Sequence, residues 1–317
     1  MRRQFIASIL LVTASPWLLA QESSWPSKPI RIVVGFPAGT PPDLFARLYG
    51  ERFGKSLGVP VVVENKPGAG GNIASDTVAK APGDGYTLLY TVSNAIVMNR
   101  HLYAKLGFDP DKDLTPVAPT LQQGLVVVVN NSVPARNVSE LVALAKAGPM
   151  NYGSYGPGGF PHLIIESMLD AAKVKMTHVP YRQGVMNDVM GGQLQVLAEP
   201  IATAMGFINS QKVRAIAYTG PARHPSLPDL PTISETYPGV AAVGWHGFWA
   251  PGNTPPEIVR KLNALVVETT KSAEVSKRIF DLHCQSRVSS PAEMASVIAS
   301  DSAAWGKVIR DKGIKLD

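Results

Sequence analysis

The sequence predicts an α/β fold with two lobes. Three observations support this prediction: strand-like runs alternate with helical patterns, the 317-residue chain is longer than one hydrophobic core usually supports, and two Gly-rich turns each lead from a strand into a helix. The composition, with 45% hydrophobic and 17% charged residues, excludes a wholly disordered chain.

Residues 1–20 carry the pattern of a secretory signal peptide. Arg2 and Arg3 form a basic start, residues 5–12 are mostly apolar, and the small residue Ala20 suits cleavage. A membrane anchor needs about 20 uninterrupted apolar residues, which this segment lacks. We therefore expect an exported, periplasmic protein whose mature chain begins after residue 20.

Strands and helices alternate in the first part of the mature chain. Strands are expected at 30–34, 59–63 and 86–92. One helix is expected to begin near Asp43 and a second to follow Gly71; their candidate core positions are Leu44, Leu48, Phe53, Ala74, Val78 and Ala79. This alternation favours a parallel sheet.

A second series of elements begins at residue 126. Helices are expected over 138–147, with Ser139 as N-cap, and from about His162. Strands are expected at 126–129, 151–153, 175–179, 194–198 and 213–218. Two long helices, over 256–271 and 291–312, each begin with a proline at a position that the first helical turn tolerates.

Composition and spacing exclude several classes of function. The single Cys284 excludes a disulfide framework and any Cys-rich metal site, and we expect it to be an inert structural thiol. The six His residues lack metal-ligand spacing, and the net charge of +6 is spread without a Lys/Arg run, which argues against nucleic-acid binding. We expect no metal and no cofactor.

Ser154 gives the one candidate for catalysis. It lies in Tyr152-Gly153-Ser154-Tyr155-Gly156, close to the G-x-S-x-G turn of hydrolases, but Tyr152 stands where the first Gly is needed. Acidic and His partners follow in the chain, as they would in any chain of this length. An exported serine hydrolase that uses Ser154 is the alternative to a binding protein.

The turns at 35–42 and 153–161 favour binding. A helix start offers unpaired backbone N–H groups and a partial positive charge, which together attract carboxylates. One such turn in each lobe, facing across a cleft, is able to hold a small anion. The same turns are also ordinary connections in α/β proteins.

Several short segments, in order along the chain, resemble one family. They are 25–34 (WPSKPIRIVV), 61–73 (VVVENKPGAGGNI), 84–88 (DGYTL), 180–181 (PY), 191–193 (GGQ), 230–232 (LPT) and 245–251 (WHGFWAP). Together they are similar to the periplasmic solute-binding receptors of tripartite tricarboxylate transporters, the Bug receptors. The resemblance covers essentially the whole mature chain.

The resemblance implies a two-lobed periplasmic binding protein fold of type II that closes over a small solute. One lobe would consist of residues 21–120 and 219–317, and the other of residues 121–218. The solute would be a carboxylate, an amide or an aromatic acid. The partners of the receptor would be membrane permease subunits or the outer domain of a sensor. We expect the receptor to be a monomer that binds no nucleic acid.

The resemblance also implies ligand-binding residues in two loops. Phe36, Gly39 and Asp43 match the family's first loop, where Thr40 replaces a second Gly. In the second loop Ser154, Gly156, Gly158 and His162 match, and Gly159 replaces a hydroxyl residue. The full expected set is Phe36, Ala38, Gly39, Thr40, Asp43, Ser154, Gly158, Gly159, His162, Tyr181, Glu199 and Trp245.

The departures from the family pattern weaken carboxylate capture. Pro41 and Pro42 have no backbone N–H, so the first helix start loses donors. We expect the Ser154 hydroxyl and the amides of Gly158 and Gly159 to hold the polar head of the solute. Purely structural roles remain open for four of these residues. Asp43 would be a helix N-cap, His162 would order its own loop, and Tyr181 and Trp245 would be packing residues.

Overall fold

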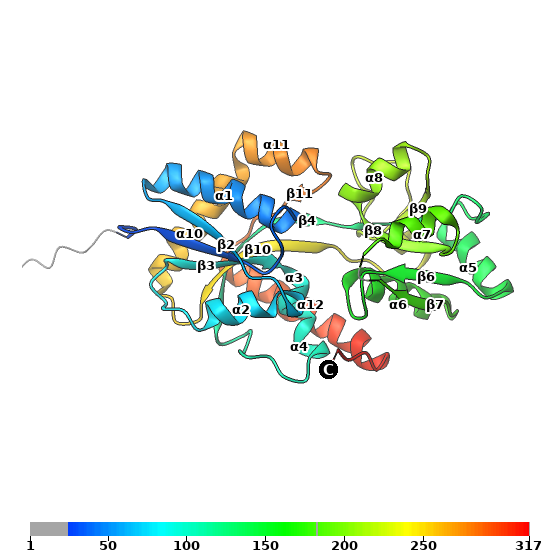
Figure 1. Cartoon of the computed structure of the whole chain (residues 1–317), viewed down its shortest axis with the longest axis horizontal. Coiled ribbons are helices and arrows are strands. Elements are labelled where there is room, and N and C mark those ends of the chain that lie inside the picture. Colours follow the sequence, from blue (N-terminus) through cyan, green and yellow to red (C-terminus); the bar gives the residue numbers. More distant parts are fainter. Residues whose placement is uncertain (1–24, 182, 317) are drawn as a thin grey trace, which may run out of the picture.

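The computed structural model describes residues 25–181 and 183–316. The expected signal peptide, residues 1–20, lies outside this part. Two lobes lie side by side, each built on one β-sheet with helices around it (Figure 1). None of the helices in the described ranges is both long and apolar enough to cross a bilayer.

The first lobe contains a six-stranded mixed sheet. The strands, in spatial order, are β11 (Gln285–Ser286), β4 (Leu114–Gln123), β10 (Gly244–Pro251), β3 (Thr87–Val92), β1 (Ile30–Val34) and β2 (Val61–Asn65). The parallel arrangement predicted for the first three strands of the chain is confirmed, because β1 pairs parallel with both β2 and β3. β10 was not predicted as a strand, and it runs antiparallel to β3 and β4.

Helices cover this sheet. They are α1 (Pro41–Leu57), η1 (Ala69–Gly71), α2 (Asn72–Ala79), α3 (Ser93–Val97), α4 (Asn99–Leu102), α10 (Pro256–Lys271), α11 (Ala273–Asp281) and α12 (Pro291–Asp311). The core position predicted at Leu44 is wrong, because Leu44 is 45% exposed. Its neighbour Phe45 turns inward instead and shares the core with Tyr49 and Phe53.

The second lobe contains a five-stranded sheet. Its strands, in spatial order, are β7 (Thr177–Pro180), β6 (Asn151–Ser154), β8 (Val196–Pro200), β5 (Leu125–Val129) and β9 (Arg214–Tyr218). Its helices are α5 (Val138–Ala147), α6 (Phe160–Ala172), α7 (Val185–Gly191), α8 (Ile201–Asn209) and α9 (Ile233–Thr236). The predicted N-cap Ser139 is wrong: the side chain of Asn137 caps α5 by accepting a hydrogen bond from Glu140 N.

The chain passes between the lobes after β4, at Gly124, and before β10, at Val243. Residues 219–242, which the predicted boundary at 219 places in the first lobe, pack with the second sheet: Thr232 pairs with Tyr218, and Ile233 and Val240 join its core. The predicted boundaries at 120 and 219 stay a prediction.

α12 and the residue that follows it also connect the two lobes. Lys312, just after α12, forms ion pairs with Glu166 at 2.6 Å and Asp170 at 2.5 Å on α6. The ring of Trp305 on α12 lies nearly perpendicular to that of Phe160, with centroids 5.7 Å apart. α12 therefore packs against both lobes.

Candidate functional site

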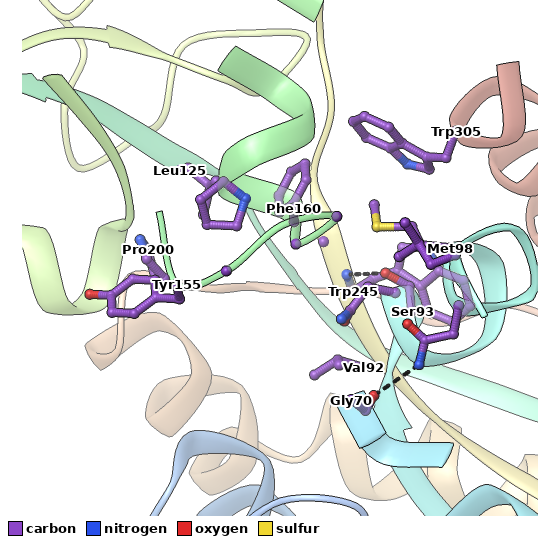
Figure 2. A pocket seen from close by; sticks show the side chains of 18 of the residues that line it. Gly70, Val92, Ser93, Met98, Leu125, Tyr155, Phe160, Pro200, Trp245 and Trp305 are labelled. Atoms are coloured by element: carbon purple, nitrogen blue, oxygen red, sulfur yellow. Dashed lines mark hydrogen bonds between the residues drawn. The ribbon is translucent and has the colours of Figure 1, made fainter. Parts of the chain in front are cut away.

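A cavity of about 480 Å³ lies between the two lobes. Its walls come from η1, α3 and α4 of the first lobe, from the β6–α6 loop of the second, and from the two passages between them. Figure 2 shows Gly70, Val92 and Ser93 on one side of it and Tyr155 and Pro200 on another. The described lining residues carry no Asp, Glu, Lys or Arg side chain.

Of the first predicted loop, Phe36 lines the cavity. Asp43, only 2% exposed, lies behind it and accepts hydrogen bonds from the Gly39 amide, Arg47 and Asn65. Asn65 also donates to the Phe36 carbonyl at 3.0 Å. Asp43 therefore fixes the loop that presents Phe36.

Burial alone would raise the pKa of Asp43. The hydrogen bonds from Arg47, Gly39 and Asn65 outweigh that effect and lower the pKa, so the carboxylate is ionised at neutral pH. Ala38 and Gly39 are exposed, and the Thr40 hydroxyl donates to the Pro37 carbonyl. Ala38, Gly39, Thr40 and Asp43 all lie outside the cavity lining.

Asp43→Ala is expected to lower the free energy of unfolding by about 2–3 kcal/mol, because three donors lose their shared acceptor. Urea unfolding measures this loss. The matched control is Glu51→Ala, which removes an exposed (i, i+4) pair with Lys55 from the same helix and should cost less than about 0.5 kcal/mol. Equal losses in the two variants would contradict the anchoring role of Asp43.

In the second predicted loop, Gly158 and Gly159 line the cavity at the start of α6. The Gly158 amide donates to His162 Nδ1 at 2.9 Å, and His162 is 6% exposed. A Cβ added to Gly158, whose φ is +73°, would lie 2.5 Å from Leu102 Cδ2. The loop is thus held by His162 from within its lobe and by Leu102 from the other.

Ser154 lies beneath this loop and is fully buried. Its hydroxyl shares a 2.6 Å hydrogen bond with His178 Nε2 and also bonds the Gly156 backbone. His178 stacks on His162 at 3.9 Å between centroids, and Tyr152 stacks on His178 at 5.0 Å. This network orders the loop and leaves Ser154 outside the cavity lining.

Although Ser154 and His178 form a Ser–His pair, the arrangement does not suit hydrolysis. A nucleophile must reach a bound substrate, and Ser154 has no exposed surface. Glu166, the nearby carboxylate, binds Tyr152 and Lys312. No described residue orients His178 as the third member of a triad would.

Glu199 lies behind Tyr155, a cavity residue that was not predicted from the sequence. It is 3% exposed and accepts a hydrogen bond from Tyr155 Oη at 2.7 Å and another from Thr203. Burial raises the pKa of Glu199. Tyr155 lines the cavity in its place.

Tyr181, the remaining predicted residue of the second lobe, donates a hydrogen bond to Asp188 and lies outside the lining. The Tyr181 hydroxyl therefore bonds within its own lobe.

Trp245 on β10 lines the cavity and is 1% exposed. Its indole N–H donates to Asp301 at 2.9 Å, and its ring stacks on Trp249. The next residue, His246, also lines the cavity, and its buried Nδ1 has no partner among the described residues. Cys284 is buried, and burial raises the pKa of its thiol to about 12, which agrees with an inert thiol.

Stability should fall as the pH decreases below about 6.5. Burial lowers the pKa of His246 to about 3, so below its unfolded-state pKa the unfolded chain binds a proton that the folded chain does not. The pKa is also lowered, chiefly by burial, at His101, His162, His178 and His224. Each such group removes up to about 1.4 kcal/mol per pH unit from the free energy of unfolding.

His246→Phe should make this dependence shallower by about 1.4 kcal/mol per pH unit between pH 6 and 4. A phenyl ring suits the site, because His246 packs against Phe45 and Tyr90. Urea unfolding across this pH range gives both slopes. Identical slopes would contradict a neutral, buried imidazole.

The sequence did not identify several lining residues as site residues, among them Gly70, Ser93, Asn94, Tyr155, Phe160, Trp305 and Leu316. Tyr155 and Phe160 flank predicted positions, so the loop as a whole was the available signal. Trp305 and Leu316 have the pattern of ordinary core residues near a helix end and give no such signal.

Comparisons with known proteins agree with this arrangement. Residues 45–314 match the sequence model of the tripartite tricarboxylate transporter family receptor. A UPF0065 protein of Bordetella bronchiseptica is 34% identical over 316 residues, which are 99% of this chain and 94% of that protein.

Solved structures are similar over most of the chain. The R. palustris protein Rpa4515 with adipate is 31% identical, with a TM-score of 0.81 over 92% of this chain and 100% of that one. The periplasmic binding protein BugD is 30% identical, with a TM-score of 0.77 over 92% and 100% of the two chains.

Proposed function

This chain belongs to the family of tripartite tricarboxylate transporter receptors, and we propose that it captures a small carboxylate between its lobes and presents it to a membrane permease. Membership confirms the resemblance seen in the sequence, the two-lobed fold and the role of a solute-binding receptor. The family consists of periplasmic receptors and not of enzymes, so the hydrolase alternative is set aside.

The observation that supports carboxylate capture is the start of α6 at the wall of the cavity. Residues 156–161 line it, and the first turn of a helix has amides without helical acceptors. Pro161 has no N–H, and the Gly158 amide is bound to His162. The amides of Gly159 and Phe160 are therefore the donors left for an anion. These amides and the helix dipole stabilise an anion without a charged side chain. The similar R. palustris protein was solved with the dicarboxylate adipate.

We assign different roles to the predicted residues. Gly159, at the N-cap of α6, contacts the carboxylate, and Phe36 and Trp245 contact the body of the solute. The Gly158 amide is already bound to His162. Ser154, His162, Asp43 and Glu199 act as positioning residues, because their polar atoms bond within the protein.

Closure of the lobes over the solute would form the surface that a permease recognises. We propose that residues 1–20 direct export and that the receptor acts as a monomer. The mass of the protein recovered from the periplasm should correspond to a chain that begins at Gln21. A mass that includes residues 1–20 would contradict removal of a signal peptide.

A thermal-shift experiment tests capture. The exported protein is unfolded and refolded to remove bound solute, and its melting temperature is measured with carboxylates, with the matching amides and with amino acids. A carboxylate at 100 times its Kd adds about 2.7 kcal/mol of stability. Stabilisation by carboxylates but not by their amides is expected; no stabilisation by any carboxylate would contradict the proposal.

A further inference from the structure

Four apolar side chains form one part of the cavity surface, which we call the apolar wall. They are Leu102, Phe160, Trp305 and Leu316. They come from α4, from α6, from α12 and from the segment that follows α12. The wall thus combines both lobes with the end of the chain.

The wall is continuous. The rings of Phe160 and Trp305 meet nearly perpendicularly, with centroids 5.7 Å apart. The Leu316 amide donates to the Leu102 carbonyl at 3.0 Å, which holds the last described residues against α4. Figure 2 shows Phe160 and Trp305 together, away from Gly70 and Val92. The only side-chain donor in the wall is the neutral indole N–H of Trp305.

The first-lobe side of the cavity carries no cationic side chain among its described residues, and the helix starts that line it, those of α3 and α4, belong to helices of five and four residues. Pro41 and Pro42 open α1 without backbone donors, and the ionised, buried carboxylate of Asp43 follows them. The Thr40 hydroxyl already donates to Pro37. The start of α1, which lies outside the cavity lining, therefore does not supply donors for a second anion either.

The other polar groups on this side are neutral. The ring of His246 packs against Phe45 and Tyr90 with its Nδ1 buried, and burial lowers the pKa of the ring, which keeps it uncharged at neutral pH. The neutral amide side chain of Asn94 is half-buried and lines the cavity. The Asn94 amide suits a hydroxyl or carbonyl of the solute, and neither group neutralises a carboxylate.

We propose, on the basis of the proposed function, that the solute is a monocarboxylate with an apolar alkyl or aromatic body. Its carboxylate lies at the start of α6, and its body packs along the apolar wall. A second carboxylate would lose its hydration without gaining a cationic partner, which makes dicarboxylates the weaker ligands. Aromatic bodies also gain from the rings of Phe160 and Trp305.

Titration calorimetry with matched acids tests this inference. Hexanoate and adipate differ by one terminal carboxylate, as do 4-methylbenzoate and terephthalate. We expect the monoacid of each pair to bind at least about ten-fold more tightly. Hexanoate should bind more tightly than butanoate by about three- to four-fold per methylene, and Leu316→Ser should reduce that gain.

A charge placed on the first-lobe side gives the reverse test. Asn94→Lys should raise the ratio of adipate affinity to hexanoate affinity at least about ten-fold, and Asn94→Gln is the neutral control. Tighter binding of the diacids by the unmodified protein would overturn the inference and leave the receptor function intact. Failure of every mono- and dicarboxylate to bind would overturn both.

Discussion

Gly158→Val is expected to weaken binding of the carboxylate by about 5- to 150-fold, because overpacking costs about 1–3 kcal/mol and would act on the loop that presents the start of α6. A side chain at this position would meet Leu102, starting at 2.5 Å from Cδ2. The loop must then move away from α4, which displaces the amides that hold the anion. Titration calorimetry measures the loss.

The matched control is Gly58→Val. Gly58 has a similar left-handed φ of +70°, but a Cβ there would have no atom within 4 Å, and it lies at the end of α1. Both variants incur the backbone strain of a side chain at a left-handed φ. Only Gly158→Val should bind the carboxylate more weakly. If the two variants bind equally well, contact between Gly158 and Leu102 does not shape the site.

Thr219→Val is expected to lower the free energy of unfolding by about 2–4 kcal/mol, because two buried backbone groups lose their partner. The Thr219 hydroxyl accepts from the Leu125 amide at 2.8 Å and donates to the Ala242 carbonyl at 3.0 Å, and the residue is fully buried. It thereby joins the two passages between the lobes. Thr219→Ser, which retains the hydroxyl, should cost less than about 1 kcal/mol. Equal losses by urea unfolding would show that methyl packing, and not the hydrogen bonds, matters here.

The helices and strands with strong local signals could be predicted from the sequence. Pro256 and Pro291 each mark the first residue of a long helix, as expected. The inward face of α1 was misplaced by one residue, since Leu44 and Phe45 are both apolar and only packing decides between them. β10 is nearly all buried, so it has no alternation of apolar and polar residues to indicate a strand.

The candidate site was predicted at the level of loops and less well at the level of atoms. Phe36, Gly158, Gly159 and Trp245 line the cavity. Ser154 could not be placed, because its partner His178 is 24 residues away and meets it only through the pairing of β6 and β7.

The apolar wall could not be predicted from the sequence for a related reason. Phe160, Trp305 and Leu316 belong to segments far apart in the chain, and they meet only because α12 packs against both lobes. An apolar residue in such a segment looks the same whether it faces a core or a cavity.

We propose that a carboxylate binds between the lobes at the start of α6. The most direct test of this proposal is titration of the refolded, exported protein with 4-methylbenzoate and with the uncharged 4-methylbenzamide. We expect saturable one-to-one binding of the acid, much weaker binding of the amide, and weakened acid binding in Gly158→Val. Absence of acid binding, or acid binding that is unchanged in Gly158→Val, would contradict it.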